Sequence, residues 1–213
     1  MSCPICNKRP PKRFCPALGE KICAICCGEG REVTIDCPMD CPYLIAAHRW
    51  EAEHRKPIAR EEFPYPDIEV PLEFVYERWQ VVTGLATAIL RFQIQNKELI
   101  DSAAFDAVEA LAETYRTLGS GIYYEKPPNA PIARALYGQL GQFVQDFRKE
   151  EANRPGFSSL KESDIFRLLV FLLRVAKQET NGRPQSRAFL GFLRARFPLP
   201  ADEIKEAPRV TLS

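Results

Sequence analysis

Residues 3–41 read CPICNKRPPKRFCPALGEKICAICCGEGREVTIDCPMDC and hold all eight cysteines of the 213-residue chain. Clustered cysteines of this kind indicate a metal site, a set of disulfides or redox-active thiols. The chain begins Met-Ser-Cys-Pro, with neither the basic start nor the apolar run of a secretory signal. We therefore expect a cytoplasmic location, where thiols stay reduced and a cysteine cluster favours metal over disulfides.

The spacing of the cysteines favours zinc. Cys3/Cys6 and Cys23/Cys26 are two C-x2-C pairs, and each pair presents two thiolates from one tight turn. Two such pairs complete one tetrahedral site, and the other four cysteines complete a second. Because Cys15 lies between the pairs, we expect the two sites to interleave as a cross-brace rather than to follow one another along the chain. We predict two zinc ions, one held by Cys3, Cys6, Cys23 and Cys26, the other by Cys15, Cys27, Cys37 and Cys41.

The motifs Cys3-Pro-Ile-Cys6, Arg13-Phe14-Cys15 and Lys21-Ile22-Cys23-Ala24-Ile25-Cys26 resemble the B-box type of zinc finger and, more loosely, the HIT finger. The resemblance covers roughly residues 3–41. It implies a cross-brace module, and fingers of this type commonly mediate contacts with proteins.

The sequence departs from the B-box pattern at two places. Leu18 stands where the B-box has an acidic or cysteine ligand, and we take Cys27 as its substitute. Cys37 and Cys41 stand where the B-box has paired histidines. An alternative places His48 as a ligand instead of Cys27 or Cys41, although His48 falls within a helical pattern.

An iron–sulfur cluster is the other metal centre that the pattern permits. Cys37-Pro-Met-Asp-Cys41-Pro matches the C-x3-C-P ending of bacterial ferredoxins. The preceding C-x2-C-x2-C run is absent, which favours zinc.

Beyond the finger the chain has a helical pattern, so we predict a mainly α fold: a double-zinc module followed by a bundle of about five helices. We assign the finger to 1–45, a helix and an acidic, proline-rich linker to 46–72, the bundle to 73–200 and a loose tail to 201–213. One helix is predicted over Phe74–Asn96, with Trp79 in its buried stripe. Asp101 or Ser102 is predicted to cap the next helix. The apolar run Leu168–Leu173 indicates a central helix.

No catalytic constellation is visible, because both histidines precede residue 55 and no glycine-rich phosphate loop occurs. We therefore expect a protein that is not an enzyme. No apolar stretch reaches the roughly 18 residues of a membrane span. The net charge of +1 gives no overall preference for nucleic acid.

One stretch is strongly basic, with seven positive residues opposed only by Glu179. Such a stretch suits a phosphate backbone or an acidic partner, unless acidic neighbours such as the linker balance it. Two functions follow: a protein-interaction adaptor, or a nucleic-acid-binding regulator that uses these residues. The seven candidates for contact are Arg167, Arg174, Lys177, Arg183, Arg187, Arg194 and Arg196.

Overall fold

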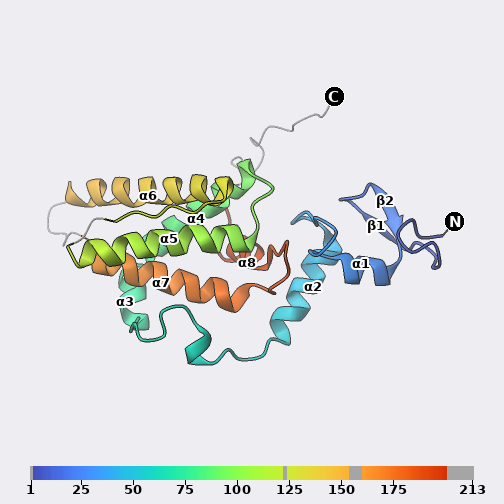
Figure 1. Ribbon diagram of the computed structural model, residues 1–213, viewed down its shortest axis with the longest axis horizontal. Coiled ribbons are helices and arrows are strands. Elements are labelled where there is room, and N and C mark those ends of the chain that lie inside the picture. The colour runs from blue at the N-terminus through green and yellow to red at the C-terminus, as the bar shows by residue number, and fades with distance from the viewer. Residues whose placement is uncertain (1, 122–123, 154–159, 201–213) are drawn as a thin grey trace.

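The computed structural model describes residues 2–121, 124–153 and 160–200. Within those ranges it contains eight α-helices, one 3-10 helix and a two-stranded hairpin, which confirms the mainly α class. The finger lies at one end and the helical bundle at the other (Figure 1). The tail from 201 to 213, predicted to be loose, lies outside the described residues.

The finger is built around a short antiparallel hairpin. Strand β1 (Arg13–Cys15) pairs with β2 (Glu20–Ile22), so that Phe14 lies opposite Lys21. The side chains alternate between the two faces, and both Phe14 and Lys21 are turned to solvent. Gly19 closes the turn at φ +69°, a left-handed conformation that glycine adopts without strain.

Two helices and a short turn carry the chain from the finger to the bundle. Helix α1 (Ala24–Gly30) follows the hairpin directly, and α2 (Pro42–Glu53) begins with a proline at its first position, where no backbone N–H is needed. Helix α2 contacts the bundle at α8. The 3-10 turn η1 (Arg60–Glu62) lies in the linker that follows.

Six helices form the bundle. Helix α5 packs against both α6 and α7, α4 packs on α6, and α8 contacts α4, α5 and α7. The bounds are Leu72–Glu77 for α3, Trp79–Gln95 for α4, Asp101–Gly119 for α5, Pro131–Ala152 for α6, Glu162–Glu179 for α7 and Ala188–Arg196 for α8.

The sixth helix arises because the single helix predicted over Phe74–Asn96 is divided in two. Arg78, at φ −114° and ψ 23°, leaves the helical conformation between α3 and α4. This break also changes the position of Trp79. Predicted as part of a buried stripe, Trp79 is 43% exposed at the start of α4, whereas Val82, Leu85 and Ile89 of the same stripe are buried.

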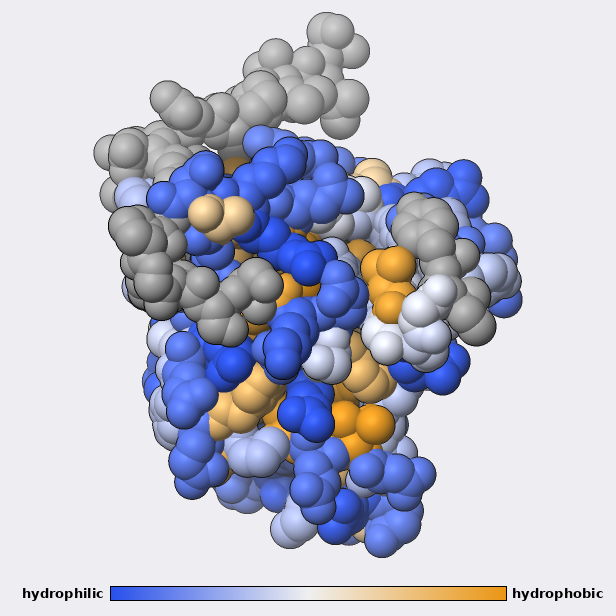
Figure 2. Space-filling view, turned by 90° about the vertical axis from the view of Figure 1, so that its left-hand side faces the viewer, coloured by the Kyte–Doolittle hydropathy of each residue, from blue (hydrophilic) through white to orange (hydrophobic). Residues whose placement is uncertain are grey.

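The helices share one apolar core, in which α7 is central. Every residue of the run Leu168–Leu173 is buried except Phe171, which is half-buried. Figure 2 looks onto the bundle end that lies at the left of Figure 1. Hydrophilic side chains cover most of that end, and hydrophobic ones show between them. No helix in the described ranges has the length and apolar character that a membrane crossing requires.

Helices α4 and α6 approach each other closely at Gly84. A Cβ atom added there would lie 2.1 Å from Cζ of Phe143, so the Phe143 ring occupies the space that glycine leaves. Any larger residue at 84 would have to displace that ring or separate the two helices.

The linker lies on the bundle and is held there by Arg174 of α7. Its Nε donates to the Pro64 carbonyl at 3.2 Å, and its Nη2 donates to the carbonyls of Tyr65 at 2.5 Å and Ile68 at 2.7 Å. Tyr65 also donates from its hydroxyl to Oε1 of Glu113 at 2.5 Å. These bonds satisfy linker carbonyls that no regular element would pair.

Candidate metal centre

Four sulfur atoms converge where the sequence predicts the first site. The Sγ atoms of Cys3, Cys6, Cys23 and Cys26 all lie within 4.8 Å of one another, and Cys6 and Cys23 are 4.0 Å apart. Zinc–sulfur bonds of about 2.3 Å in a tetrahedron place neighbouring sulfurs about 3.8 Å apart. Three of these side chains are buried and Cys6 is half-buried. The cluster therefore fits a closed four-thiolate metal site.

Backbone N–H groups orient the sulfurs. Cys23 caps the N-terminus of α1, and its Sγ accepts from the N–H of Cys26 at 3.4 Å. The N–H of Cys23 donates in turn to Sγ of Cys3 at 3.3 Å. The first pair is shaped by a turn in which Asn7 donates to the Cys3 carbonyl at 2.8 Å. Such N–H···S bonds stabilise thiolates and fix the direction of their lone pairs.

The same hydrogen bonds give the thiols of the cluster different pKa values. Burial opposes ionisation of Cys3, but N–H groups of Cys23, Cys6 and Ile5 prevail and lower its pKa to about 6. The N–H of Cys26 lowers the pKa of Cys23, and hydrogen bonding to Cys23 raises the pKa of Cys26 to about 12. Metal binding must therefore release at least the proton of Cys26.

The second predicted set is gathered less tightly. In the part of the chain that the structure describes, the cluster of Cys3, Cys6, Cys23 and Cys26 is the one group of potential ligands whose donor atoms all lie that close together. The remaining four cysteines, Cys15, Cys27, Cys37 and Cys41, line the same small core of the finger.

Within that set, two of the predicted co-ligands of Cys37 affect its pKa. Burial raises the pKa of Cys37, and the neighbouring Cys41 and Cys15 add to the rise. Cys27 is half-buried, and its Sγ lies 3.6 Å from Nη1 of Arg13. Both the identity of the metal as zinc and the second ion remain predictions.

Both histidines make other contacts. Nε2 of His48 lies 2.9 Å from Oε2 of Glu32, at the junction between finger and bundle. Nδ1 of His54 lies 2.8 Å from the Trp50 carbonyl, and its ring stacks on Trp50 at 4.3 Å. Neither side chain belongs to the cluster of four sulfurs.

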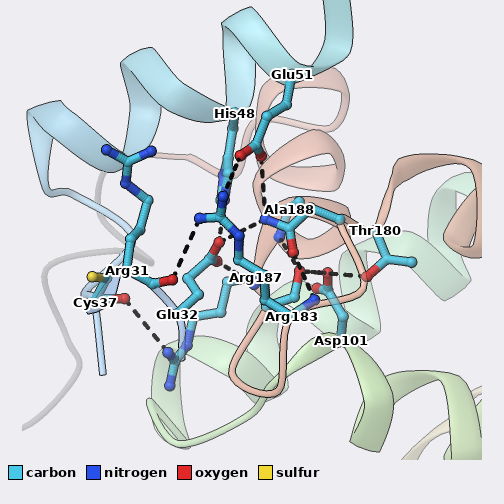
Figure 3. A network of polar contacts seen from close by, with 12 residues as sticks. Arg31, Glu32, Cys37, His48, Glu51, Asp101, Thr180, Arg183, Arg187 and Ala188 are labelled. Carbon is cyan, nitrogen blue, oxygen red and sulfur yellow. Dashed lines mark hydrogen bonds and ion pairs between the residues drawn. The ribbon is translucent and has the colours of Figure 1, made fainter. Parts of the chain in front are cut away.

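Glu32 is the centre of the junction between the finger and the bundle (Figure 3). It is completely buried, at φ +52°, in the loop after α1. Its carboxylate accepts from His48, from Nδ2 of Asn181 at 2.7 Å and from the N–H of Arg187 at 2.7 Å. Burial opposes ionisation, but these donors, His48 first, hold the pKa of Glu32 below its usual value. Its carbonyl also accepts from the N–H of Gln185 at 2.9 Å.

Arg187, a residue of the bundle, also binds the finger. Only 3% of this residue is exposed, and its guanidinium pairs with Asp36 of the finger. It also donates to the carbonyls of Leu99 at 3.2 Å and Lys97 at 3.0 Å, in the loop before α5. One side chain of the bundle thus joins the finger to the loop before α5.

Arg183 and Asp101 complete the junction. Arg183 forms an ion pair with Glu51 of α2 at 3.0 Å and donates to the carbonyl of Arg31 at 3.3 Å. Asp101, predicted to cap its own helix α5, is the first residue of that helix and caps α8 instead. Its carboxylate accepts from the N–H groups of Phe189 at 3.0 Å and Leu190 at 3.2 Å. It also accepts from the hydroxyl of Ser186 at 2.6 Å.

The basic stretch is therefore divided between the interior and the surface. Arg174, Arg183 and Arg187 bond to other parts of the chain. As a buried residue, Arg187 is not available to a partner, contrary to the prediction for it. The four residues that remain exposed are Arg167, Lys177, Arg194 and Arg196.

Nothing in the sequence predicts the structural role of Glu32. No motif surrounds it, and its partners come from residues up to 155 positions away. A lone carboxylate in a loop has the same appearance in sequence whether it is exposed or buried.

Comparison of the chain with protein-family models, curated proteins and solved structures yields no match. The four N-terminal cysteines lie close enough together to hold a metal, and no family match confirms the resemblance to B-box fingers.

Proposed function

We propose that the chain is a non-catalytic zinc protein that acts as an adaptor in the cytoplasm, with its finger fixed to its helical bundle for contact with protein partners. The observation that carries the proposal is the closed cluster of four cysteine sulfurs. Four protein thiolates leave zinc no open position for water or substrate, so such a site is structural. All eight cysteines are free, as a metal site requires.

The proposal includes a second zinc ion on Cys15, Cys27, Cys37 and Cys41, which share the core of the finger with the first four cysteines. Elemental analysis of the purified chain tests the metal and its stoichiometry. We expect two zinc ions and no iron. One ion per chain would restrict the site to the first cluster, and iron with visible absorbance would overturn the choice of zinc.

We favour a protein partner over nucleic acid. Three of the seven basic residues proposed for phosphate contact form intramolecular bonds through their side chains, which supports this choice. The test is affinity capture by the intact zinc-loaded protein, with and without nuclease. We expect a captured protein that survives nuclease and is lost after chelation of zinc. Capture that disappears with nuclease would favour the nucleic-acid alternative, as would salt-dependent retention on heparin that Arg194→Glu abolishes.

A further inference from the structure

The corner between α3 and α4 exposes a continuous group of apolar side chains. Tyr76 is 69% exposed, Leu72 61% and Trp79 43%. The rings of Tyr76 and Trp79 have centroids 6.4 Å apart, and Trp79 lies 5.7 Å from Phe197, which follows α8. We call these four residues the corner patch. Isolated exposed apolar residues are ordinary, but contiguous ones mark interaction sites.

Helix α3 contacts the core of the bundle through residues outside the corner patch. Val75, which is only 2% exposed, provides the inward contact of this short helix. Phe74 is covered by two guanidinium groups, those of Arg78 at 4.5 Å and Arg167 at 5.8 Å from the ring centroid. Leu72 and Tyr76 lie one turn apart on α3, and more than half of the surface of each is exposed.

Carboxylates line the α3 side of the corner patch. Glu73 and Glu77 are exposed and follow Leu72 and Tyr76 along α3, one position later in each case. Glu69 lies just before the helix and is also exposed. Arg78 pairs with Glu77 at 3.0 Å and with Asp164 at 3.6 Å. On the α8 side the exposed Arg196 directly precedes Phe197, so the acidic rim is confined to α3 and the segment just before it. An aromatic centre with an acidic rim selects a partner that is both apolar and basic.

We propose that the corner patch binds a basic amphipathic helix of a partner protein. Apolar side chains of that helix pack on Leu72 and Tyr76, an arginine lies over the ring of Trp79, and other basic groups pair with Glu73 and Glu77. The carboxylates of α3 repel phosphates, which disfavours nucleic acid on that side of the corner patch. In Figure 1, α3 lies at the end of the bundle away from the finger. This proposal rests on the proposed adaptor function and identifies the corner patch as the surface that contacts the partner.

The two tryptophans of the chain allow a direct test. In the zinc-loaded, full-length Trp50→Phe variant, Trp79 is the sole tryptophan and reports on the corner patch. The probe is a synthetic helical peptide with leucines at positions i, i+3, i+4 and i+7 and arginines elsewhere. We expect its addition to shift Trp79 emission to the blue and to protect it from acrylamide. The same peptide with glutamates for arginines should do neither, and Trp50 in the Trp79→Phe variant should be unaffected.

Surface variants locate the binding. Tyr76→Ser should weaken the arginine peptide by about tenfold, because aromatic residues at the centre of an interface dominate affinity. The double variant Glu73→Lys and Glu77→Lys should lose the arginine peptide and gain the glutamate peptide. Ile45→Ser on α2 is the matched control, since Ile45 is 46% exposed and distant in sequence, and it should leave the affinity unchanged.

Three outcomes would overturn the proposal: no change in Trp79 emission, equal binding of both peptides, or equal weakening by Ile45→Ser. A shift that depends on protein concentration without peptide would assign the corner patch to a second copy of this chain. Zinc content and affinity capture are measured on the same protein. If zinc content and affinity capture give the expected results while Trp79 emission does not change, the corner patch is not the binding site and the adaptor function stands.

Discussion

The backbone N–H of Arg187 donates to Oε1 of Glu32 at 2.7 Å, although 155 positions separate the two residues. Both residues are buried, so displacing either one leaves a polar group of the other buried without its hydrogen-bond partner. The bond makes the start of α8 and the loop of the finger one structural unit. The stability of the bundle and that of the metal-binding finger are therefore expected to be linked.

Glu32→Gln tests this unit. A neutral amide cannot accept from three donors as the carboxylate does, and it leaves one donor unpaired in a buried position. We expect a loss of about 2–3 kcal/mol in the free energy of unfolding, measured by urea denaturation. Glu29→Gln, an exposed change in α1, is the control and should be nearly neutral. Equal stability of the two variants would contradict the central role of Glu32.

The ionisation of Glu32 gives this loss a pH dependence. The folded-state pKa of Glu32 lies below its ordinary value of 4.5, so the carboxylate adds stability above that pH. This contribution disappears as pH falls through the lower folded-state value. The difference in unfolding free energy between wild type and Glu32→Gln should be constant near neutral pH and shrink below about pH 4.5. A difference that grows on acidification would show that another group is responsible.

Arg187→Lys should destabilise the protein although it keeps the charge. Lysine cannot reach the Leu99 and Lys97 carbonyls and the Asp36 carboxylate together, because its ammonium lacks the planar fork of arginine. We expect a loss of about 3 kcal/mol in thermal or chemical unfolding. Arg194→Lys, which changes an exposed residue of α8, should have no measurable effect. A stable Arg187→Lys variant would mean that charge alone holds the junction.

Two cysteine variants distinguish the two metal sites. Cys23→Ser removes a sulfur that accepts one of the N–H···S bonds and belongs to the closed cluster, so we expect loss of metal and unfolding of the finger. Cys27→Ser should remove one zinc ion and leave the other, as measured by elemental analysis. Two ions retained in Cys27→Ser would exclude this residue as a ligand. His54→Ala should keep both ions.

Two glycine variants test the packing of α4 on α6. Gly84→Ala should cost about 1–3 kcal/mol, because the new methyl group would meet the Phe143 ring. Gly138→Ala in α6 adds the same methyl group with nothing within 4 Å, and it should stabilise the protein by about 0.5–1 kcal/mol. Thermal melts of both variants make the comparison. If Gly138→Ala also destabilised the protein, the helix propensity of alanine would not determine the stability of α6 at this position.

The pattern of residues predicted the helical class, the first metal cluster and the central helix. Each of these features is local: two C-x2-C turns shape their own ligand pairs, and the run Leu168–Leu173 is apolar on nearly every side. The divided helix at Arg78 was not predicted, because the apolar spacing continues across it. The second metal site was predicted from a count of remaining cysteines, and counting does not specify how closely they approach one another.

By itself, the sequence determined which residue types gather in the finger and where helices form, because thiolate chemistry and helical periodicity act over a few residues. Only the tertiary structure decided the roles of Glu32, Asp101 and Arg187. Their partners are brought to them from distant segments, and a charged side chain becomes structural only where burial removes water and supplies opposite charge or hydrogen bonds. For the same reason, only the fold showed that Tyr76 and Trp79 remain at the surface together.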